Sequence, residues 1–141
     1  MKIQIECDYD QLVVMRDALD TYGRLGMGQL ENSMFPIMIE SMLWKDKDNT
    51  LSKWDPGIKF HLEALKKIIF NLEPNASYGI TNPNTPDAAK LSYEMCKKLE
   101  NFMYEEQNKD IPENEREYNV MKNEPLSLTG KGFVKVNEVK Q

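Results

Sequence analysis

The sequence predicts an α+β fold in which about four helices pack with a small antiparallel sheet. Apolar residues recur at spacings of three and four in several segments, which is typical of amphipathic helices. Polar and apolar residues alternate over 2–7 and again over 126–136, which indicates an N-terminal strand and a C-terminal hairpin. The length of 141 residues fits a single domain, 1–141.

The first predicted elements are a strand and a helix. In 2–7 the alternation places apolar side chains on one side only, as in a half-buried strand. Asp8 or Asp10 can then cap a helix over 10–25, because an aspartate oxygen accepts a backbone N–H of the first turn. The apolar face of this helix consists of Leu12, Met15, Leu19 and Tyr22.

Glycines interrupt the pattern at the end of this helix. Gly23, Gly26 and Gly28 fall within six positions, and each costs up to about 1 kcal/mol relative to alanine in a helix interior. Such a cluster indicates a close backbone approach or a kink. The helical period resumes over 28–43, where Pro36 must bend or end the second helix.

The two most regular helical patterns come later in the chain. A stripe of isoleucines and leucines predicts an amphipathic helix over 57–72. The segment 73–86 is rich in proline and asparagine and is expected to form a loop around Tyr78. Thr85 can cap the next helix, 86–106, which carries apolar residues at spacings of three and four.

The C-terminal third is expected to be less regular. Residues 107–125 are rich in Asn, Glu and Lys, which predicts a loosely packed segment. Its possible apolar tethers are Ile111, Tyr118, Val120 and Met121. A turn at 129–132 then joins two short alternating runs, which predicts the hairpin that completes the sheet.

Composition excludes several classes of function. The net charge of −5 provides no positive field for a nucleic-acid backbone, so general nucleic-acid binding is not expected. No apolar stretch is long enough for a membrane span, and Met1 to Glu6 is not followed by the apolar region of a signal peptide. We therefore expect a cytoplasmic protein without membrane contact.

Catalytic and metal chemistry is also not expected. The chain has a single histidine, His61, and two cysteines, Cys7 and Cys96, which are far apart and are interpreted as reduced thiols. These residues cannot form a Cys/His zinc site or a nucleophile–histidine pair of the usual kind. We expect no metal, no cofactor, no catalytic residue and no enzymatic activity.

Two segments are candidates for binding a small ligand. Arg24 adjoins the glycines, and its guanidinium could hold a phosphate in a bidentate contact, although an ion pair with Asp20 is the simpler interpretation. Tyr78 beside Gly79 could stack on a base, or it could plug the edge of the core. Tyr93 borders the apolar stripe of its helix and has the same two interpretations.

These segments also carry a resemblance to a known group of proteins. The run from Tyr22 to Gln29, the loop Tyr78-Gly79-Ile80 and the helix start at Pro86-Asp87 resemble a widespread family of small bacteriophage and prophage proteins. The family pattern is an aromatic-x-Arg-x-x-Met-Gly-Gln run followed by a Tyr-Gly-Ile loop. The match covers about residues 10–100, over the helical patterns described above. The residues that align are Arg24, Met27, Gly28, Gln29, Tyr78, Gly79 and Ile80.

The resemblance implies a phage protein that acts in the cytosol of a bacterial host. Small acidic phage proteins without catalytic groups often inhibit host defence, and one class sequesters the cyclic nucleotides used as immune signals. By this analogy we expect a homo-oligomer that binds a small anionic nucleotide without cleaving it. The expected ligand-binding residues are Tyr22, Arg24, Met27, Gly28, Gln29, Tyr78, Gly79 and Tyr93.

Two other functions stay open at this point. The protein could be an acidic inhibitor that docks on a host defence effector or nuclease, with the region from Glu105 to Glu117 as the candidate surface. A metal-dependent nucleotide hydrolase would need a cluster of ligands, and the sequence offers none.

Overall fold

The fold is helical. The computed structural model describes residues 5–34, 56–117, 119–122, 127–130 and 135–137. No strand occurs within these stretches, so the predicted antiparallel sheet, and with it the α+β class, is wrong.

The predicted helices are confirmed to within a few residues where the structure describes them. The longer helices are α1 (Tyr9–Gly26), α3 (Pro56–Phe70) and α4 (Asp87–Gln107), and two 3₁₀ turns follow as η2 (Glu113–Glu115) and η3 (Val120–Lys122). Residues 30–34 are helical as well, and the rest of the predicted 28–43 helix, with Pro36, lies outside the described residues. None of the helices in this part of the chain has the length and apolar character that crossing a membrane requires.

Helix α1 begins at a capping box. The Asp8 carboxylate accepts the Gln11 backbone N–H at 2.8 Å, and the Gln11 side chain accepts the Asp8 N–H at 3.0 Å. Both bonds satisfy amide groups that have no partner inside the helix. Of the two caps that the sequence allowed, the structure uses Asp8.

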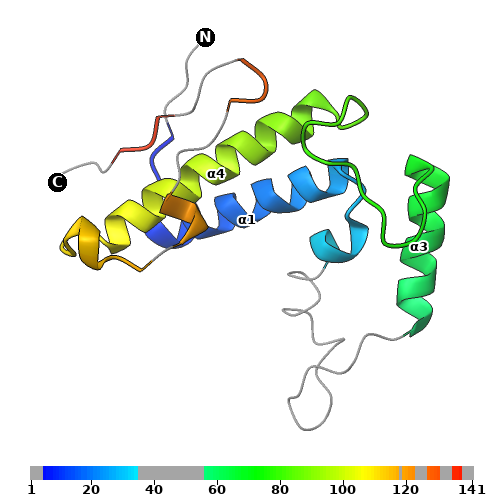
Figure 1. The fold of residues 1–141 in the computed structure, drawn as a ribbon, viewed down its shortest axis with the longest axis horizontal. Helices are drawn as coiled ribbons and strands as arrows, with labels where there is room; N and C mark the ends of the chain where they lie inside the picture. Colours follow the sequence, from blue (N-terminus) through cyan, green and yellow to red (C-terminus); the bar gives the residue numbers. More distant parts are fainter. Residues whose placement is uncertain (1–4, 35–55, 118, 123–126, 131–134, 138–141) are drawn as a thin grey trace, which may run out of the picture.

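Helices α1 and α4 form an antiparallel pair that contains the core (Figure 1). Leu12 of α1 packs with Leu99 and Met103 of α4, and all three are buried. The Ser92 hydroxyl of α4 donates a 2.8 Å hydrogen bond to the Leu19 carbonyl of α1. The two helices are therefore joined by apolar packing and by a polar contact along their length.

The glycines predicted to allow a close approach do so at the end of α1. A Cβ atom at Gly26 would lie 2.2 Å from the Cβ of Ala89, a fully buried residue of α4. A Cβ at Gly23 would meet its nearest atom, the Ala89 carbonyl oxygen, at 3.6 Å, which is ordinary van der Waals contact. The contact between Gly26 and Ala89 is thus the one that sets how closely the helices approach.

The chain turns immediately after α1 through a left-handed residue. Gly28 has φ +73°, and a side chain there would also meet Leu72 at 2.7 Å. Glycine adopts this conformation without the steric penalty of other residues. The turn directs the next helical segment, 30–34, away from α4 (Figure 1).

Thr85 has a different role from the predicted helix cap. Pro86 is the N-cap of α4, and no side chain caps that end of the helix. The buried Thr85 hydroxyl instead donates a 2.9 Å hydrogen bond to the Gly79 carbonyl and closes the loop that precedes α4. A threonine hydroxyl can accept a backbone N–H at a helix start or donate to a carbonyl in a loop, so the sequence did not separate the two roles.

Helix α3 lies apart from the helix pair. It packs against neither α1 nor α4 among the described residues, and the loop 71–80 leads from its C-terminus back toward them (Figure 1). Several of its apolar side chains are exposed. The most exposed of them are Phe60, Ile68 and Ile69.

The C-terminal segment is held by a side chain and not by a sheet. The carboxylate of Glu94, which is 2% exposed, accepts the backbone N–H groups of Leu128 and Thr129 and the Thr129 hydroxyl. In the predicted hairpin, Leu128 would have been the end of a strand and Thr129 the start of the turn. Residues 5–7 and 135–137 are likewise not strands, and the other positions of the predicted strand and hairpin, 2–4, 126 and 131–134, lie outside the described residues.

The segment after α4 is irregular, as the sequence predicts, but its tethers are polar. Asn101 donates hydrogen bonds to the Met121 and Lys122 carbonyls, at 3.0 and 3.3 Å. Of the expected apolar tethers, Ile111 and Val120 are exposed at 41% and 67%, Met121 is half-buried, and Tyr118 lies outside the described residues. Side chains of α4 therefore hold this segment through its backbone carbonyls.

Replacing Gly26 with alanine should destabilise the fold by about 1–3 kcal/mol, because the added methyl group overlaps Ala89 and the helices must separate. The matched control is Gly23→Ala, where space for a Cβ exists and helix propensity favours alanine by up to about 1 kcal/mol. Urea unfolding followed by circular dichroism measures both. Equal stability of the two variants would contradict the close-approach argument.

Glu94→Gln should weaken the attachment of the C-terminal segment. Burial raises the pKa of Glu94, but the hydrogen bonds from Thr129 and Leu128 outweigh burial and bring this pKa below the ordinary value of 4.5. The stabilisation is therefore complete above pH 4.5 and is lost as the pH falls through the lower pKa of the folded state.

Wild type should thus be more stable than Glu94→Gln by about 1–3 kcal/mol at pH 7, and the difference should shrink toward pH 3. Unfolding curves across this pH range measure the difference. A difference that is independent of pH would show that the charge of Glu94 does not hold the segment.

Candidate functional site

An open hollow lies where the end of α1, the loop before α4 and the first half of α4 meet. Its volume is about 460 Å³, which is within the range of small-molecule sites. The residues that line it are Asp20, Arg24, Met27, Gln29, Ser77, Tyr78, Gly79, Ile80, Tyr93 and Lys97. Polar, charged and aromatic side chains therefore converge from three segments that are far apart in the sequence.

Backbone hydrogen bonds fix two of these segments to each other. The Tyr78 N–H donates to the Met27 carbonyl at 2.9 Å, and this bond joins the loop to the end of α1. On the other side of the Gly28 turn, the Gln29 N–H donates to the Arg24 carbonyl at 2.9 Å. The first bond therefore fixes the loop to the end of α1, and the second fixes Gln29 relative to Arg24.

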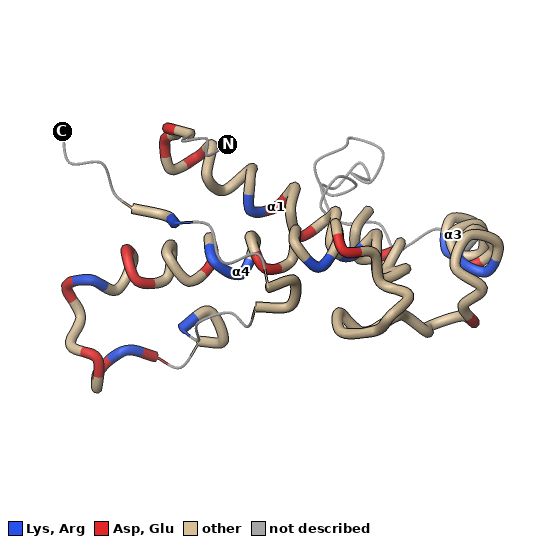
Figure 2. The backbone as a smooth tube through the Cα atoms, turned by 90° about the horizontal axis from the view of Figure 1, so that it is seen from above, with Lys and Arg blue, Asp and Glu red and all other residues tan. Residues whose placement is uncertain are grey.

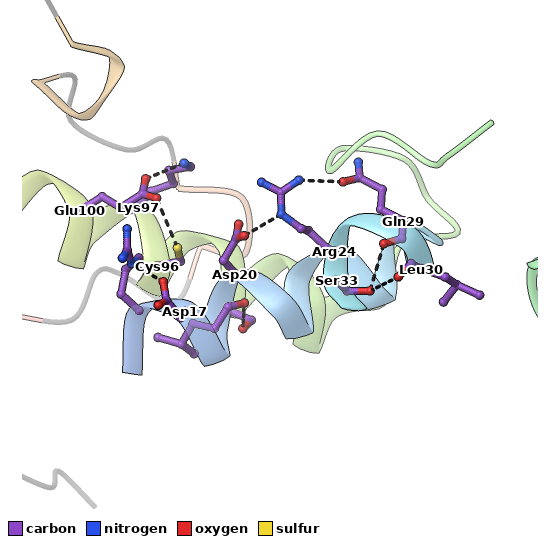
Figure 3. A network of polar contacts seen from close by, with 12 residues as sticks. Asp17, Asp20, Arg24, Gln29, Leu30, Ser33, Cys96, Lys97 and Glu100 are labelled. Carbon is purple, nitrogen blue, oxygen red and sulfur yellow. Dashed lines mark hydrogen bonds and ion pairs between the residues drawn. The ribbon is translucent and has the colours of Figure 1, made fainter. Parts of the chain in front are cut away.

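Arg24 is held by two side-chain partners. Its Nε donates to the Asp20 carboxylate at 2.6 Å, and its Nη1 donates to the Gln29 amide oxygen at 3.1 Å (Figure 3). The ion pair with Asp20 that the sequence suggested is therefore present, and Arg24 lines the hollow as well. A guanidinium has five N–H groups, so these two bonds leave donors for a ligand.

Tyr78 serves the structure and lines the hollow at the same time. Its hydroxyl donates a 2.7 Å hydrogen bond to the Phe70 carbonyl at the end of α3, and its ring meets the Phe70 ring edge-on at 6.5 Å. The residue is half-buried. Its hydroxyl is therefore engaged by the fold while its side chain borders the hollow, and stacking on a base stays a prediction.

The α4 side of the hollow carries Tyr93 and Lys97, one turn apart. The Lys97 ammonium lies 5.4 Å from the centre of the Tyr93 ring and 2.5 Å from a carboxylate oxygen of Glu100 (Figure 3). Burial lowers the pKa of Lys97, but the hydrogen bond and charge of Glu100 outweigh burial and raise this pKa above its ordinary value. Lys97 is therefore fully charged at neutral pH.

Most of the residues predicted to bind a ligand lie together at this hollow. They are Arg24, Met27, Gln29, Tyr78, Gly79 and Tyr93. Tyr22 does not line the hollow and is exposed on α1. Gly28 does not line it either, and its N–H, expected to face an anion, donates to the Leu25 carbonyl at 3.0 Å.

Four lining residues were not among the expected ligand-binding residues, and they are Asp20, Ser77, Ile80 and Lys97. Asp20 had been considered only as an ion-pair partner of Arg24. Lys97 could have been found, because it follows Tyr93 by four positions and so shares its helix face. Arg16, one turn before Asp20 on α1, forms its ion pair with Asp17.

Cys96 lies beside this site but is buried. Its thiol donates to Glu100 at 3.8 Å and is fully shielded from solvent (Figure 3). Burial, together with the nearby carboxylates of Glu100 and Asp20, raises the pKa of the Cys96 thiol to about 12. Cys7, in contrast, is exposed.

Comparison with known proteins gives no match: no protein-family model, no curated protein and no solved structure resembles this chain. The described residues also contain no group of three or more His, Cys, Asp or Glu side chains placed to hold a metal ion.

The two thiols should differ sharply in reactivity. Only the thiolate reacts quickly with a disulfide reagent, and a pKa of about 12 leaves Cys96 protonated at pH 8. Ellman's reagent should therefore titrate only Cys7 in the native protein, and both thiols in denaturant. Cys7→Ser should remove the fast reaction. Rapid reaction of two thiols in the native state would contradict the burial of Cys96.

Proposed function

We propose that the chain binds a small anionic nucleotide in this hollow and holds it without cleaving it. The observation that carries the proposal is the convergence of Arg24, Lys97, Tyr78 and Tyr93, from separate segments, on one open hollow. Arginine and lysine donate to phosphate oxygens, and tyrosine rings offer faces on which a base stacks. The resemblance to phage proteins extends the proposal to sequestration of a cyclic nucleotide used in bacterial immune signalling.

Binding without cleavage is favoured by the state of the charged groups. The Asp20 carboxylate is paired with Arg24, and Glu100 is paired with Lys97, so neither is free to act as a general base. The single histidine, His61, is on α3 and does not line the hollow. We therefore propose a binding protein and not a hydrolase.

The proposal includes a homo-oligomer in the cytosol of the host. Exposed apolar side chains on α3 are of the kind that form contacts between subunits, and they support this part of the proposal. A shared interface could enclose a ligand that the open hollow of one chain leaves partly in water.

The alternative of an acidic inhibitor receives less support. Three of the carboxylates between Glu105 and Glu117 form ion pairs in the structure. The pairs are Glu105 with Arg116, Glu106 with Lys109 and Glu113 with Lys122. Blue and red segments are also interleaved along α4 and the segment that follows it (Figure 2). Such a surface is a poor imitation of the charge of a nucleic acid.

The test is to incubate the purified protein with a panel of cyclic mono- and dinucleotides and to measure depletion of free ligand. Heat should then release the bound nucleotide, and mass spectrometry should find it intact. A degraded nucleotide would identify a hydrolase instead. If none of the nucleotides in the panel binds, the proposal is overturned and the acidic inhibitor is left as the alternative.

Arg24→Ala should lower the affinity for the bound nucleotide at least about tenfold, because a charge-assisted hydrogen bond contributes about 1.5–3 kcal/mol. Isothermal titration calorimetry measures the affinity. The matched control is Arg16→Ala, which removes the same side chain from the same helix at a position outside the hollow. Equal loss in both variants, or no loss in either, would remove Arg24 from the site.

A further inference from the structure

The charges at the hollow occur as two separate ion pairs. Arg24 is 2.6 Å from Asp20, and Lys97 is 2.5 Å from Glu100. Arg24, Asp20 and Lys97 line the hollow directly, and Glu100 is bonded to Lys97 next to it on α4 (Figure 3). The two cations and two carboxylates sum to no net charge, so the site differs from the strongly positive sites that hold several phosphates.

The pairs leave many hydrogen-bond donors but little excess charge. Arg24 uses Nε for Asp20 and one Nη1 hydrogen for Gln29, and its other N–H groups have no partner within the described stretches. Lys97 uses one of its three N–H donors for a hydrogen bond to Glu100. A phosphate at this position would therefore be recognised by its oxygen atoms and not by its total charge.

Further negative charge on a ligand would lie close to Asp20 or Glu100, and each cation of the described lining, Arg24 and Lys97, is already paired with one of these carboxylates. The Asp20 side chain is 27% exposed and borders the same space as Arg24, so a ligand close to one is close to the other. Two like charges at about 4 Å repel by roughly 1–4 kcal/mol near a protein surface. Repulsion of this size is sufficient to discriminate between ligands that share a base.

We propose, on the basis of the binding function above, that the hollow accepts one phosphodiester with a single negative charge and rejects nucleoside di- and triphosphates. In a phosphodiester, two unesterified oxygens share the charge, and Arg24 and Lys97 approach from opposite segments to donate to them. Asp20 and Glu100 act as the selecting groups, because they oppose any further phosphate.

The experiment compares ligands that share a base and differ in charge. Calorimetry at low ionic strength is run with adenosine, cyclic AMP, ADP and ATP, and with the matching guanine series. In the series that binds, the cyclic monophosphate should bind at least about tenfold more tightly than the nucleoside and the triphosphate, which corresponds to about 1.4 kcal/mol.

Variants of the two carboxylates test whether Asp20 and Glu100 cause the preference for the cyclic monophosphate over the triphosphate. Asp20→Asn and Glu100→Gln each remove one negative charge and keep a similar shape, so each should raise the affinity for the triphosphate relative to the cyclic monophosphate. Asp17→Asn is the matched control, because Asp17 is on α1 and does not line the hollow. Its ratio of affinities should equal that of wild type.

The outcomes separate this inference from the proposed function. A triphosphate that binds wild type as tightly as the cyclic monophosphate would overturn the charge selection while nucleotide binding stands. Equal binding of the nucleoside would also overturn it, because the phosphate would then not be recognised. If no nucleotide binds, including the cyclic dinucleotides of the earlier panel, the proposed function itself fails and this inference fails with it.

Discussion

The contact between Gly26 and Ala89 is the constraint on which the other features of the site depend. It brings the C-terminal end of α1 against the first turn of α4, where any larger side chain at Gly26 would collide with Ala89. The approach places Arg24 opposite Tyr93 and brings the Met27 carbonyl within reach of the Tyr78 amide. Without this close crossing, the three segments that line the hollow would not share one space.

The helices could be predicted from the sequence, whereas the predicted sheet is wrong, and the reason for the difference is physical. Helical periodicity and caps such as Asp8 depend on residues a few positions apart, so they are readable locally. Alternation over 126–136 says that a segment is extended, but not where its amides donate. In this fold the Leu128 and Thr129 amides donate to Glu94, a carboxylate about thirty positions earlier that no local pattern connects to them.

The segments that form the candidate site could be predicted from the sequence, but the charge balance of the site could not. Arg24 and Tyr78 were identified as candidates because a cation beside glycines and an aromatic ring in a loop are unusual locally. Each ion pair lies within one helix, Lys97 with Glu100 on α4 and Arg24 with Asp20 on α1. That the two pairs lie at the same site depends on how α4 packs against α1. Net charge at a site is a sum over residues that folding brings together, and the overall charge of −5 does not reveal it.

Tyr78 gives helix α3 a mechanical connection to the hollow. Its hydroxyl holds the Phe70 carbonyl at the end of α3, and its amide is bonded to Met27 beside Arg24. Helix α3 packs against neither α1 nor α4 in the described chain. Tyr78 contacts both the end of α3 and the end of α1 while lining the hollow, so that a displacement of α3 would act on the wall of the site through this residue.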